Sequence, residues 1–276
     1  MSPSLVVEFT KMHGAGNDFL VLDNRWYRFS EDELSELAAT WCPRRFGVGA
    51  DGLLALDEAE SDAAYRMRYV NADGSWAAMC GNGARCLARF ALQADFEGPE
   101  LAFETDAGRY YAAESPESPD QIRLYVPPAG PMHLDVPVEA TLPEAVHFVH
   151  TGTEHLVVFV PDVEQVPVGE WAPPLRSDPH VQPEGANVNF VEVDGDGSLR
   201  MRTYEKGVEA ETLACGTGVL AAAVVAEATE RVAANPVTVQ TRGGTLTVGT
   251  AATNRGDERY LEGPVVSVFR GSLQVT

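Results

Sequence analysis

The chain has 276 residues, of which 45% are hydrophobic and 8% aromatic, and it carries a formal net charge of −21. This length and composition are typical of a globular protein with two domains. The acidic excess speaks against nucleic acid or an anionic membrane as a partner. The chain opens with no charged segment followed by an apolar run, and no apolar run is long enough to span a bilayer, so we expect a cytoplasmic protein.

The first half of the chain is expected to mix short strands with two helices. A capping box formed by Ser30 and Glu33 begins a helix that ends at Cys42. A second helix runs from the Gly81 region to about Ala94. Strands are predicted where apolar segments are bounded mostly by glycine, proline, asparagine or aspartate, at residues 5–10, 19–22, 64–70, 101–104, 109–113 and 121–126.

A proline-rich stretch without a clear period lies between Pro127 and Pro143 and is the best candidate for a crossing between two halves. We therefore predict an N-terminal domain at residues 1–127 and a C-terminal domain at residues 128–264. A final strand around residues 265–269 could return to either half. We assign residues 265–276 to completing the N-terminal domain.

The second half repeats the plan of the first. An alanine- and valine-rich helix is predicted from about Thr217 to Thr229, and because it is apolar on nearly all sides we expect sheet around it. Arg242, Gly243 and Gly244 are typical of a hairpin turn. Strands are predicted at residues 146–150, 156–160, 188–193, 199–204, 237–241, 245–248 and 265–269.

Four cysteines, at positions 42, 80, 86 and 215, are few for a chain of this size. None forms the CxxC pair expected of a zinc site or a dithiol motif, and a disulfide scaffold is not indicated. We therefore predict no metal site and reduced thiols. Cys42 and Cys86 are interpreted as core residues, because a lone cysteine is more often buried than catalytic.

Two of the cysteines occur in matching contexts. Cys80 precedes Gly-Asn-Gly and Cys215 precedes Gly-Thr-Gly, and each tripeptide opens a predicted helix. A thiol at a helix N-terminus lies over unpaired backbone N–H groups, which lower the pKa of a thiol and attract anions. The pattern predicts two thiols that face one anionic substrate.

Two thiols suit the inversion of a carbon that lies next to a carboxylate. One thiolate removes the proton from one side and one thiol returns a proton on the other, while the helix N-termini stabilise the charge that develops. Racemases that depend on pyridoxal phosphate need a Schiff-base lysine. This chain has two lysines, Lys11 and Lys206, so a route without a cofactor gains weight.

Five segments resemble the signature blocks of diaminopimelate epimerases, and they occur in that family's order. They are residues 12–19 (MHGAGNDF), 71–75 (NADGS), 80–86 (CGNGARC), 187–190 (NVNF) and 211–218 (ETLACGTG). The resemblance implies an α+β fold of two pseudo-symmetric domains, each a curved and mostly antiparallel sheet wrapped round a central helix. It also implies a cofactor-independent isomerase that interconverts LL- and meso-2,6-diaminopimelate in lysine and peptidoglycan biosynthesis.

The resemblance also implies roles for individual residues. Cys80 and Cys215 would be the two acid/base residues, and His155 and Glu205 would support them. The substrate would be an amino acid, with no nucleic acid or membrane partner, and a homodimer stays open. Substrate-binding residues would be Asn17, Asn71, Gly81, Asn82, Asn187, Glu205, Lys206, Gly216 and Thr217.

Three positions depart from the family pattern. Lys206 stands where arginine is common, Gly52 replaces a glutamine seen in some members, and Thr153 replaces an asparagine. A lysine cannot make the planar bidentate pair that an arginine makes with a carboxylate. All three positions concern substrate recognition, so the reaction type is better supported than the substrate.

Other readings of these residues stay open. Asn17, Asn71 and Asn187 could be turn-forming asparagines. The Cys80 loop looks like that of a thiol phosphatase, but the position that would need arginine holds Cys86. A redox sensor, a non-catalytic amino-acid-binding protein and an epimerase of proline, hydroxyproline or a basic amino acid are further alternatives.

The acidic charge supports one separate hypothesis, namely adaptation to a salty cytoplasm, where screening removes self-repulsion. The chain has 41 acidic residues against 20 basic ones. An ordinary acidic enzyme is the alternative, and the dependence of its stability on salt would distinguish the two.

Overall fold

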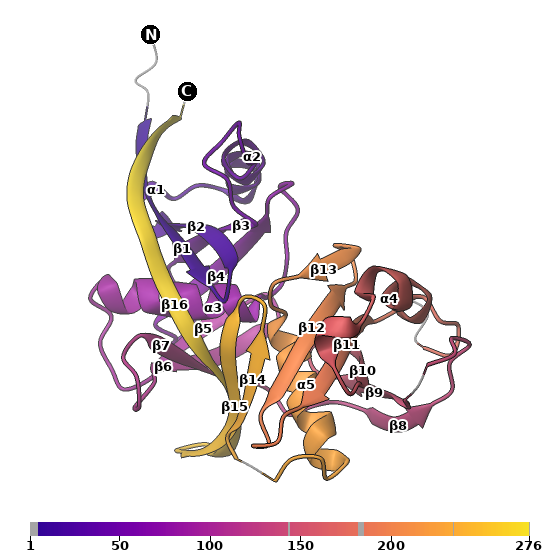
Figure 1. Cartoon of the computed structure of the whole chain (residues 1–276). Coiled ribbons are helices and arrows are strands. Elements are labelled where there is room, and N and C mark those ends of the chain that lie inside the picture. The colour runs from indigo at the N-terminus through magenta and orange to yellow at the C-terminus, as the bar shows by residue number, and fades with distance from the viewer. Residues whose placement is uncertain (1–4, 143, 182–184, 234, 276) are drawn as a thin grey trace. The chain divides into compact units, whose positions relative to one another are not determined.

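The computed structural model describes residues 5–142, 144–181, 185–233 and 235–275 (Figure 1). Pro143, at the end of the predicted crossing, and residues 1–4 and 276, at the two ends of the predicted N-terminal domain, lie outside the described residues. The chain divides into two compact units. Unit 1 consists of Met1–Leu124 and Gly263–Thr276, and unit 2 consists of Tyr125–Glu262.

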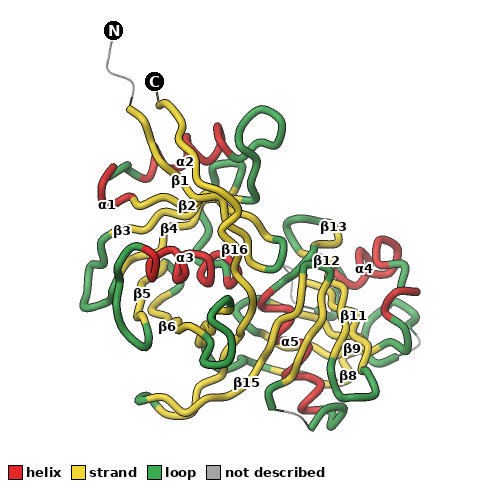
Figure 2. Tube along the Cα trace, turned by 60° about the vertical axis from the view of Figure 1, so that its left-hand side comes forward, coloured by secondary structure: helices red, strands yellow, loops and turns green. Residues whose placement is uncertain are grey.

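Unit 1 is a sheet of short strands with α3 (Gly81–Gln93) packed against it. The buried side of α3 includes Leu87, Ala88 and Ala91, and the helix contacts β1, β2, β3, β4 and β6. Figure 2 shows this helix among the strands of its unit. The other elements are β1 (Leu5–Gly14), β2 (Asn17–Asp23), α1 (Asn24–Tyr27), α2 (Glu31–Trp41), β3 (Gly52–Asp57), β4 (Tyr65–Asn71), β5 (Leu101–Thr105), β6 (Gly108–Glu114) and β7 (Gln121–Tyr125).

Unit 2 has the same kind of core around α5 (Gly216–Ala228), which contacts β9, β10, β11, β12, β14 and β15. Nine residues of α5 are buried, as expected for a helix that is apolar on nearly all sides. The other elements are β8 (Met132–Val136), β9 (Val146–His150), β10 (Glu154–Phe159), η1 (Val163–Gln165), α4 (Val168–Arg176), β11 (Asn187–Val193), β12 (Leu199–Glu205), β13 (Ala210–Thr212), β14 (Val237–Thr241) and β15 (Gly244–Thr253).

The two units repeat one order of strands and helices. In unit 1, β1 pairs antiparallel with β2, β2 parallel with β3, β3 antiparallel with β4, and β4 parallel with β5 across α3. In unit 2, β9, β10, β11, β12 and β14 repeat those four pairings, with α5 in the place of α3. Helices α2 and α4 occupy matching places in the chain. The helix α2 comes between the parallel strands β2 and β3, and α4 comes between the parallel strands β10 and β11. The predicted α+β fold of two pseudo-symmetric sheets, each round a helix, is confirmed.

The last strand, β16 (Gly256–Val275), contributes to both units. Its first part pairs with β15, with Glu262 opposite Thr247. Its later part pairs with β1, with Val275 opposite Leu5, so the two ends of the described chain lie side by side (Figure 1). The sequence predicted only a short strand around residues 265–269, because the exposed residues of this strand follow no simple alternation.

Several elements were missed from the sequence. The strand β3 reads GLLALD and is buried at five of six positions, so it lacks the alternation that marks a half-exposed strand. The helix α4 contains Pro173 and Pro174, which sequence reasoning takes as breakers. The strand β8 lies inside the stretch that was predicted to be a crossing. Among the described residues, no helix combines the length and apolar character needed to cross a membrane.

Candidate active site

The first predicted catalytic residue, Cys80, is the N-cap of α3 in unit 1. Its backbone is extended, with φ −141° and ψ 120°, and its Sγ accepts a hydrogen bond from the backbone N–H of Gly83 at 3.4 Å. Sulfur here takes the place that a serine or aspartate oxygen takes in an ordinary cap. Because Gly81 and Asn82 are the next residues, their backbone N–H groups lie at the helix N-terminus, where four N–H groups lack intrahelical partners.

Asn17 is brought to Cys80 from the start of β2. Its Oδ1 lies 3.6 Å from the Sγ of Cys80 and 3.3 Å from the Nδ2 of Asn82. Its Nδ2 donates to the carboxylate of Asp51 at 2.8 Å. Because a carboxylate only accepts, this contact fixes the amide nitrogen toward Asp51 and the amide oxygen toward the helix start.

A charged network lies behind Asn17. Asp18 accepts hydrogen bonds from Lys11 and Arg44, each at 2.6 Å, and Arg44 also donates to Asp51 at 3.0 Å. Burial alone would raise the pKa of Asp18, but the hydrogen bonds and charges of Arg44 and Lys11 outweigh it and lower that pKa to about 2. Asp18 is therefore ionised at neutral pH, and the hydrogen bonds of the network hold Asp51 and Asn17 in place.

Arg85, the fifth residue of α3, puts a buried positive charge near the start of this helix. Its side chain is fully buried, with Nη2 donating to the Oδ1 of Asn82 at 2.8 Å and Nη1 donating to the carbonyl of Gly81 at 3.3 Å. Burial lowers the pKa of Arg85, and interaction with the thiolate forms of Cys86 and Cys80 raises it. The guanidinium thus orders the backbone beside Cys80 and favours negative charge there.

Asn71 ends β4, nine residues before Cys80. Its Nδ2 donates to the hydroxyl of Ser75 at 3.0 Å, and its backbone N–H donates to the carbonyl of Ser75 at 2.8 Å. These bonds belong to a turn at Asn71–Ser75, in which Gly74 has φ +86°. The turn-forming role that the sequence left open for Asn71 is therefore present.

The second predicted catalytic residue, Cys215, is the N-cap of α5 in unit 2. It is 7% exposed, and its Sγ lies 3.4 Å from the hydroxyl of Thr217. The backbone is again extended, with φ −112° and ψ 111°. Gly216 and Thr217 begin the helix as Gly81 and Asn82 do in unit 1.

His155 lies behind Thr217 and is completely buried at the start of β10. Its Nε2 is 2.9 Å from the Thr217 hydroxyl and 3.5 Å from the Nδ2 of Asn187, while its Nδ1 is 3.1 Å from the Nδ2 of Asn189. Burial is the main cause that lowers the pKa of His155 to about 3. The imidazole is therefore neutral at physiological pH.

Lys206 is hydrogen-bonded to three other residues of unit 2. Its backbone N–H donates to the Oδ1 of Asn187 at 2.8 Å, and its ammonium donates to the carboxylate of Glu154 at 2.7 Å and to the carbonyl of Gly185 at 3.4 Å. The hydrogen bond from Lys206 is the main reason that the pKa of Glu154 falls to about 2. The cation predicted to bind substrate is thus already paired with Glu154.

Glu205 ends β12, in the place that Asn71 has at the end of β4. Its carboxylate accepts a hydrogen bond from the hydroxyl of Thr212 in β13, and its backbone carbonyl accepts one from Glu209 at 2.8 Å. Thr153, one of the departures from the family pattern, donates its hydroxyl to Glu154 at 3.1 Å. Unit 2 thus brings together Cys215, Thr217, His155 and Asn187, with Lys206 bonded to Asn187.

The remaining cysteines are unlike these two. Cys42 and Cys86 are 1% and 0% exposed, and burial raises the pKa of each thiol to about 12. Both are core residues, as predicted.

Gly52, another departure, begins β3 where space is short. A Cβ at this position would lie 2.7 Å from the Tyr69 ring and 2.7 Å from the carbonyl of Val70. A glutamine therefore could not replace Gly52 without movement of β4.

Sequence reasoning missed four residues that are hydrogen-bonded to predicted ones: Asp51, Arg85, Glu154 and Asn189. Two of these lay within quoted motifs, since Arg85 follows Cys80 by five residues and Asn189 follows Asn187 by two. Arg85 lies near the start of an apolar helix, and Asn189 lies among apolar residues of a strand. A polar side chain in such a place is expected to be buried and to need hydrogen-bond partners. The sequence could have indicated both residues in this way.

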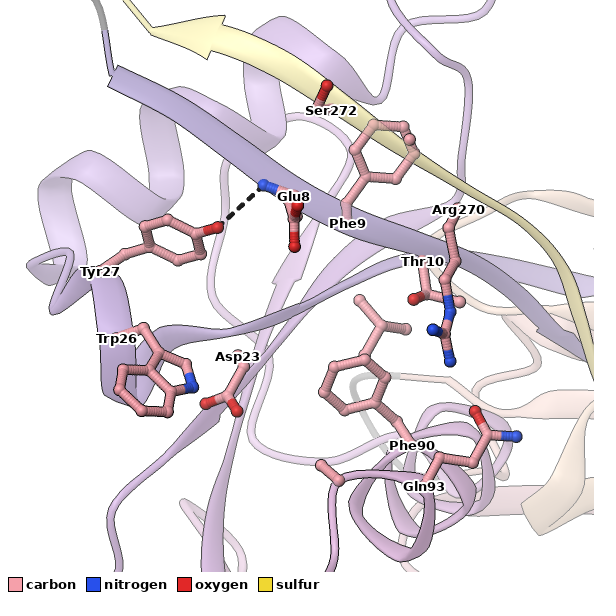
Figure 3. Close-up of a pocket in the computed structure, with 13 residues that line it drawn as sticks. Glu8, Phe9, Thr10, Asp23, Trp26, Tyr27, Phe90, Gln93, Arg270 and Ser272 are labelled. Carbon is pink, nitrogen blue, oxygen red and sulfur yellow. Dashed lines mark hydrogen bonds between the residues drawn. The ribbon is translucent and has the colours of Figure 1, made fainter.

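One hollow of about 590 Å³ in unit 1 lies away from Cys80 (Figure 3). Phe90, Gln93 and Ala94 line it from the C-terminal end of α3, opposite the end that Cys80 caps. At 1.5 Å per residue, these ends are about 15 Å apart. None of its lining residues is a predicted site residue. Its walls also include Glu8, Phe9, Thr10, Val21, Asp23, Trp26, Tyr27, Arg270, Gly271 and Ser272.

The fold is shared with several solved structures. A PhzF-family phenazine biosynthesis protein from Bacillus anthracis superposes with a TM-score of 0.75 at 17% identity, covering 98% of this chain and 100% of that one. A hydroxyproline epimerase from Agrobacterium vitis superposes with a TM-score of 0.66 at 17% identity, covering 98% of this chain and 93% of that one. The chain therefore has the two-unit fold of these structures, with a cysteine at the N-cap of the central helix in each unit.

The sequence places the chain more narrowly. The family described as diaminopimelate epimerase matches residues 9–124 and 147–268. Diaminopimelate epimerases from Methanothrix thermoacetophila and Chlorobaculum tepidum are 41% and 39% identical, over 96% and 95% of this chain and 95% and 99% of their own lengths. The chain belongs to the diaminopimelate epimerase family and is an isomerase.

Proposed function

We propose that this protein interconverts LL- and meso-2,6-diaminopimelate by proton transfer between two cysteines and the substrate α-carbon. The observation that carries the proposal is the repeated placement of Cys80 and Cys215 as N-caps of equivalent helices in a chain of this family. The product would serve lysine and peptidoglycan biosynthesis. Units 1 and 2 would be the two epimerase domains, with the boundaries predicted from the sequence near residues 127 and 264.

In the proposed reaction, one cysteine is a thiolate and removes the α-proton, and the other is a thiol and delivers its proton to the opposite face. After one turnover the first sulfur carries the proton and the second is the thiolate, so protons balance and no redox change occurs. Both helix N-termini supply backbone N–H groups to the α-carboxylate, on which charge develops as the carbanion forms.

The substrate would be held by polar groups at the same two helix starts. Asn187 supports this role, because its Oδ1 is fixed by the backbone of Lys206 and its Nδ2 is directed toward the His155 side of the site. Asn17 would bind the substrate because its side-chain amide lies beside the Sγ of Cys80. The full proposed set is Asn17, Asn71, Gly81, Asn82, Asn187, Glu205, Lys206, Gly216 and Thr217.

An epimerase of a monocarboxylate amino acid, such as hydroxyproline, is the second candidate. A substrate with a single carboxylate would not need the ammonium of Lys206, and the chain keeps that cation half-buried beside Glu154. This favours a substrate that carries a second carboxylate.

The test follows reduced enzyme with LL-diaminopimelate in D₂O, measuring deuterium at the α-carbon and the isomer ratio by chiral chromatography. We expect exchange together with formation of the meso isomer, and loss of both in Cys80→Ser and Cys215→Ser. Cys42→Ala, which changes a buried thiol outside both helix starts, is the matched control and should stay active. Wild-type enzyme that exchanges hydroxyproline but not diaminopimelate would overturn the substrate assignment.

We further propose a cytoplasmic homodimer. The support is a group of exposed apolar side chains on the paired strands β1 and β16, namely Leu5, Val6, Val266, Val268 and Phe269. Sedimentation equilibrium should give twice the mass of the 29.7 kDa chain. A monomer at micromolar concentration would contradict this proposal.

A further inference from the structure

The two helix starts differ in what lies behind them. Gly52 and Asn187 are equivalent, because each begins its strand and pairs across a parallel ladder, Gly52 with Phe19 and Asn187 with His155. Two residues further along, unit 1 has Leu54 and unit 2 has Asn189. The surroundings of Cys80 therefore include an apolar pair, Phe19 and Leu54, where those of Cys215 include a polar pair, His155 and Asn189.

Leu54 and Asn189 both face the glycine that follows the helix cysteine by three residues. A Cβ on Gly83 would lie 3.1 Å from the Cδ2 of Leu54, and a Cβ on Gly218 would lie 2.4 Å from the Oδ1 of Asn189. Asn189 is completely buried. Burying an amide costs free energy unless its N–H groups and its oxygen all have hydrogen-bond partners. The hydrogen-bond partners of Asn189 therefore indicate its role.

Its neighbours fix which way the amide of Asn189 points. The Nδ2 lies 2.8 Å from the carbonyl of Leu156, which can only accept, and the Oδ1 accepts the hydroxyl hydrogen of Thr203 at 3.0 Å. Exchanging N and O would set two oxygens against each other at 2.8 Å. The second N–H of Nδ2 is then directed at the Nδ1 of His155, 3.1 Å away.

This N–H decides the tautomer of His155. Nδ1 must accept, and because the imidazole is neutral its single proton is on Nε2. Nε2–H donates to the hydroxyl of Thr217 at 2.9 Å. The Nδ2 of Asn187 is 3.5 Å from Nε2, beyond the ordinary range of an N–H hydrogen bond, so it does not compete for this nitrogen. With its oxygen occupied as acceptor, that hydroxyl has its own hydrogen available for the Sγ of Cys215 at 3.4 Å.

We propose that Asn189 is a positioning residue for Cys215: through the tautomer of His155 it directs the Thr217 hydroxyl to donate to the Cys215 sulfur and so stabilises the thiolate. The proposal rests on the proposed function only for its catalytic meaning. Every donor in the relay from Thr203 through Asn189, His155 and Thr217 points toward the sulfur. In unit 1, Leu54 and Phe19 stand where Asn189 and His155 stand in unit 2, and neither can take part in such a relay.

Charged groups around His155 also bear on this relay. Glu154 on the same strand favours the imidazolium, whereas His150 on β9 and Lys206 after β12 disfavour it. The Glu154 carboxylate is bonded to Lys206, and desolvation has the largest effect on His155. These groups therefore leave His155 neutral and leave its tautomer to Asn189.

The test measures the rate of iodoacetamide alkylation of each cysteine against pH, with the peptides quantified by mass spectrometry. Thr217→Val removes the hydroxyl, and Asn189→Leu installs the residue that unit 1 has at the equivalent place. We expect both variants to raise the alkylation midpoint of Cys215 by about one pH unit, the effect of one lost hydrogen bond to a charged group. The midpoint of Cys80 in the same molecules should not move.

Thr151→Val is the matched control, because it also removes a buried threonine hydroxyl, one that donates to the backbone carbonyl of Thr217 at 2.8 Å and not to the relay. An unchanged Cys215 midpoint in Thr217→Val would overturn the proposal. So would an equal shift in Thr151→Val, or a shift in Thr217→Val that Asn189→Leu does not share. The readout needs no substrate, so it is independent of whether diaminopimelate is turned over.

A second measurement covers the case in which Asn189→Leu does not fold. Imidazole ¹⁵N spectra of the wild-type enzyme, assigned with His155→Gln, should show His155 neutral at pH 7 with its proton on Nε2. A proton on Nδ1, or an imidazolium, would refute the role of Asn189 directly.

Discussion

Gly218 and Gly83 offer a direct comparison of the two helix starts. Each is the third residue of its helix, so replacement by alanine gives both the same gain in helix propensity, at most about 1 kcal/mol. The new methyl groups meet different neighbours. At position 83 the Cβ would lie 3.1 Å from the end of the flexible Leu54 side chain. At position 218 it would lie 2.4 Å from the Oδ1 of Asn189.

The amide of Asn189 has little freedom to move away, because hydrogen bonds to Thr203, Leu156 and His155 hold it. We expect Gly218→Ala to lose about 1–3 kcal/mol from overpacking and about 1 kcal/mol for each hydrogen bond it breaks. After the helix gain, the net loss should be about 1–3 kcal/mol. Gly83→Ala should stay within about 1 kcal/mol of wild type.

The two variants should also differ in activity. A methyl group at position 218 lies 3.3 Å from the Cβ of Cys215 and displaces the relay to it, and small misplacements of catalytic groups cost on the order of 100-fold in rate. Urea unfolding would give the stabilities, and α-hydrogen exchange in D₂O would give the activities. If Gly218→Ala were as stable and as active as Gly83→Ala, the packing argument would be refuted.

Three further outcomes are expected. Burial lowers the pKa of His155 from 6.5 to about 3, so between these pH values the unfolded chain binds a proton that the folded chain does not. The contribution to the free energy of unfolding is therefore full above pH 6.5 and is lost as the pH falls toward 3. In His155→Gln the free energy of unfolding should depend less on pH in this range, and an unchanged dependence would contradict the assignment. Lys206→Met should raise the KM for diaminopimelate about ten-fold or more, with a smaller effect on kcat. Because this variant leaves the Glu154 carboxylate unpaired, the double variant with Glu154→Gln is the control. An unchanged KM in both the single and the double variant would show that Lys206 does not bind substrate. If the charge of −21 reflects adaptation to salt, the melting temperature should drop markedly when molar KCl is withdrawn, whereas a protein equally stable at low salt would be an ordinary acidic enzyme.

Motifs that act within a few residues could be predicted from the sequence. The capping box of Ser30 and Glu33 is present, with the Ser30 backbone N–H donating to Glu33 at 2.8 Å. Cys80 and Cys215 cap helices because glycines follow them and an apolar period begins there. Such features depend on backbone groups one to four positions apart, which the sequence states directly.

The environment of those residues could not be predicted in the same way. Asp51 reaches Asn17 across 34 residues, and Lys206 reaches Glu154 across 52. The order of strands alone decides which of many aspartates, glutamates and asparagines come within hydrogen-bond distance. The sequence therefore named Asn17 and Lys206 but not the carboxylates that hold them.

The sequence by itself determined the family, the two cysteine-capped helix starts and the sheet-and-helix plan of each half, because these follow from local hydrogen bonding and hydrophobic period. The tertiary structure decided the rest. It buried His155 and so made it neutral, paired Lys206 with Glu154, and set Asn189 against Gly218 where unit 1 has Leu54. Desolvation and side-chain orientation arise only when distant strands pack together, and this is why the support for each cysteine became visible only in the folded chain.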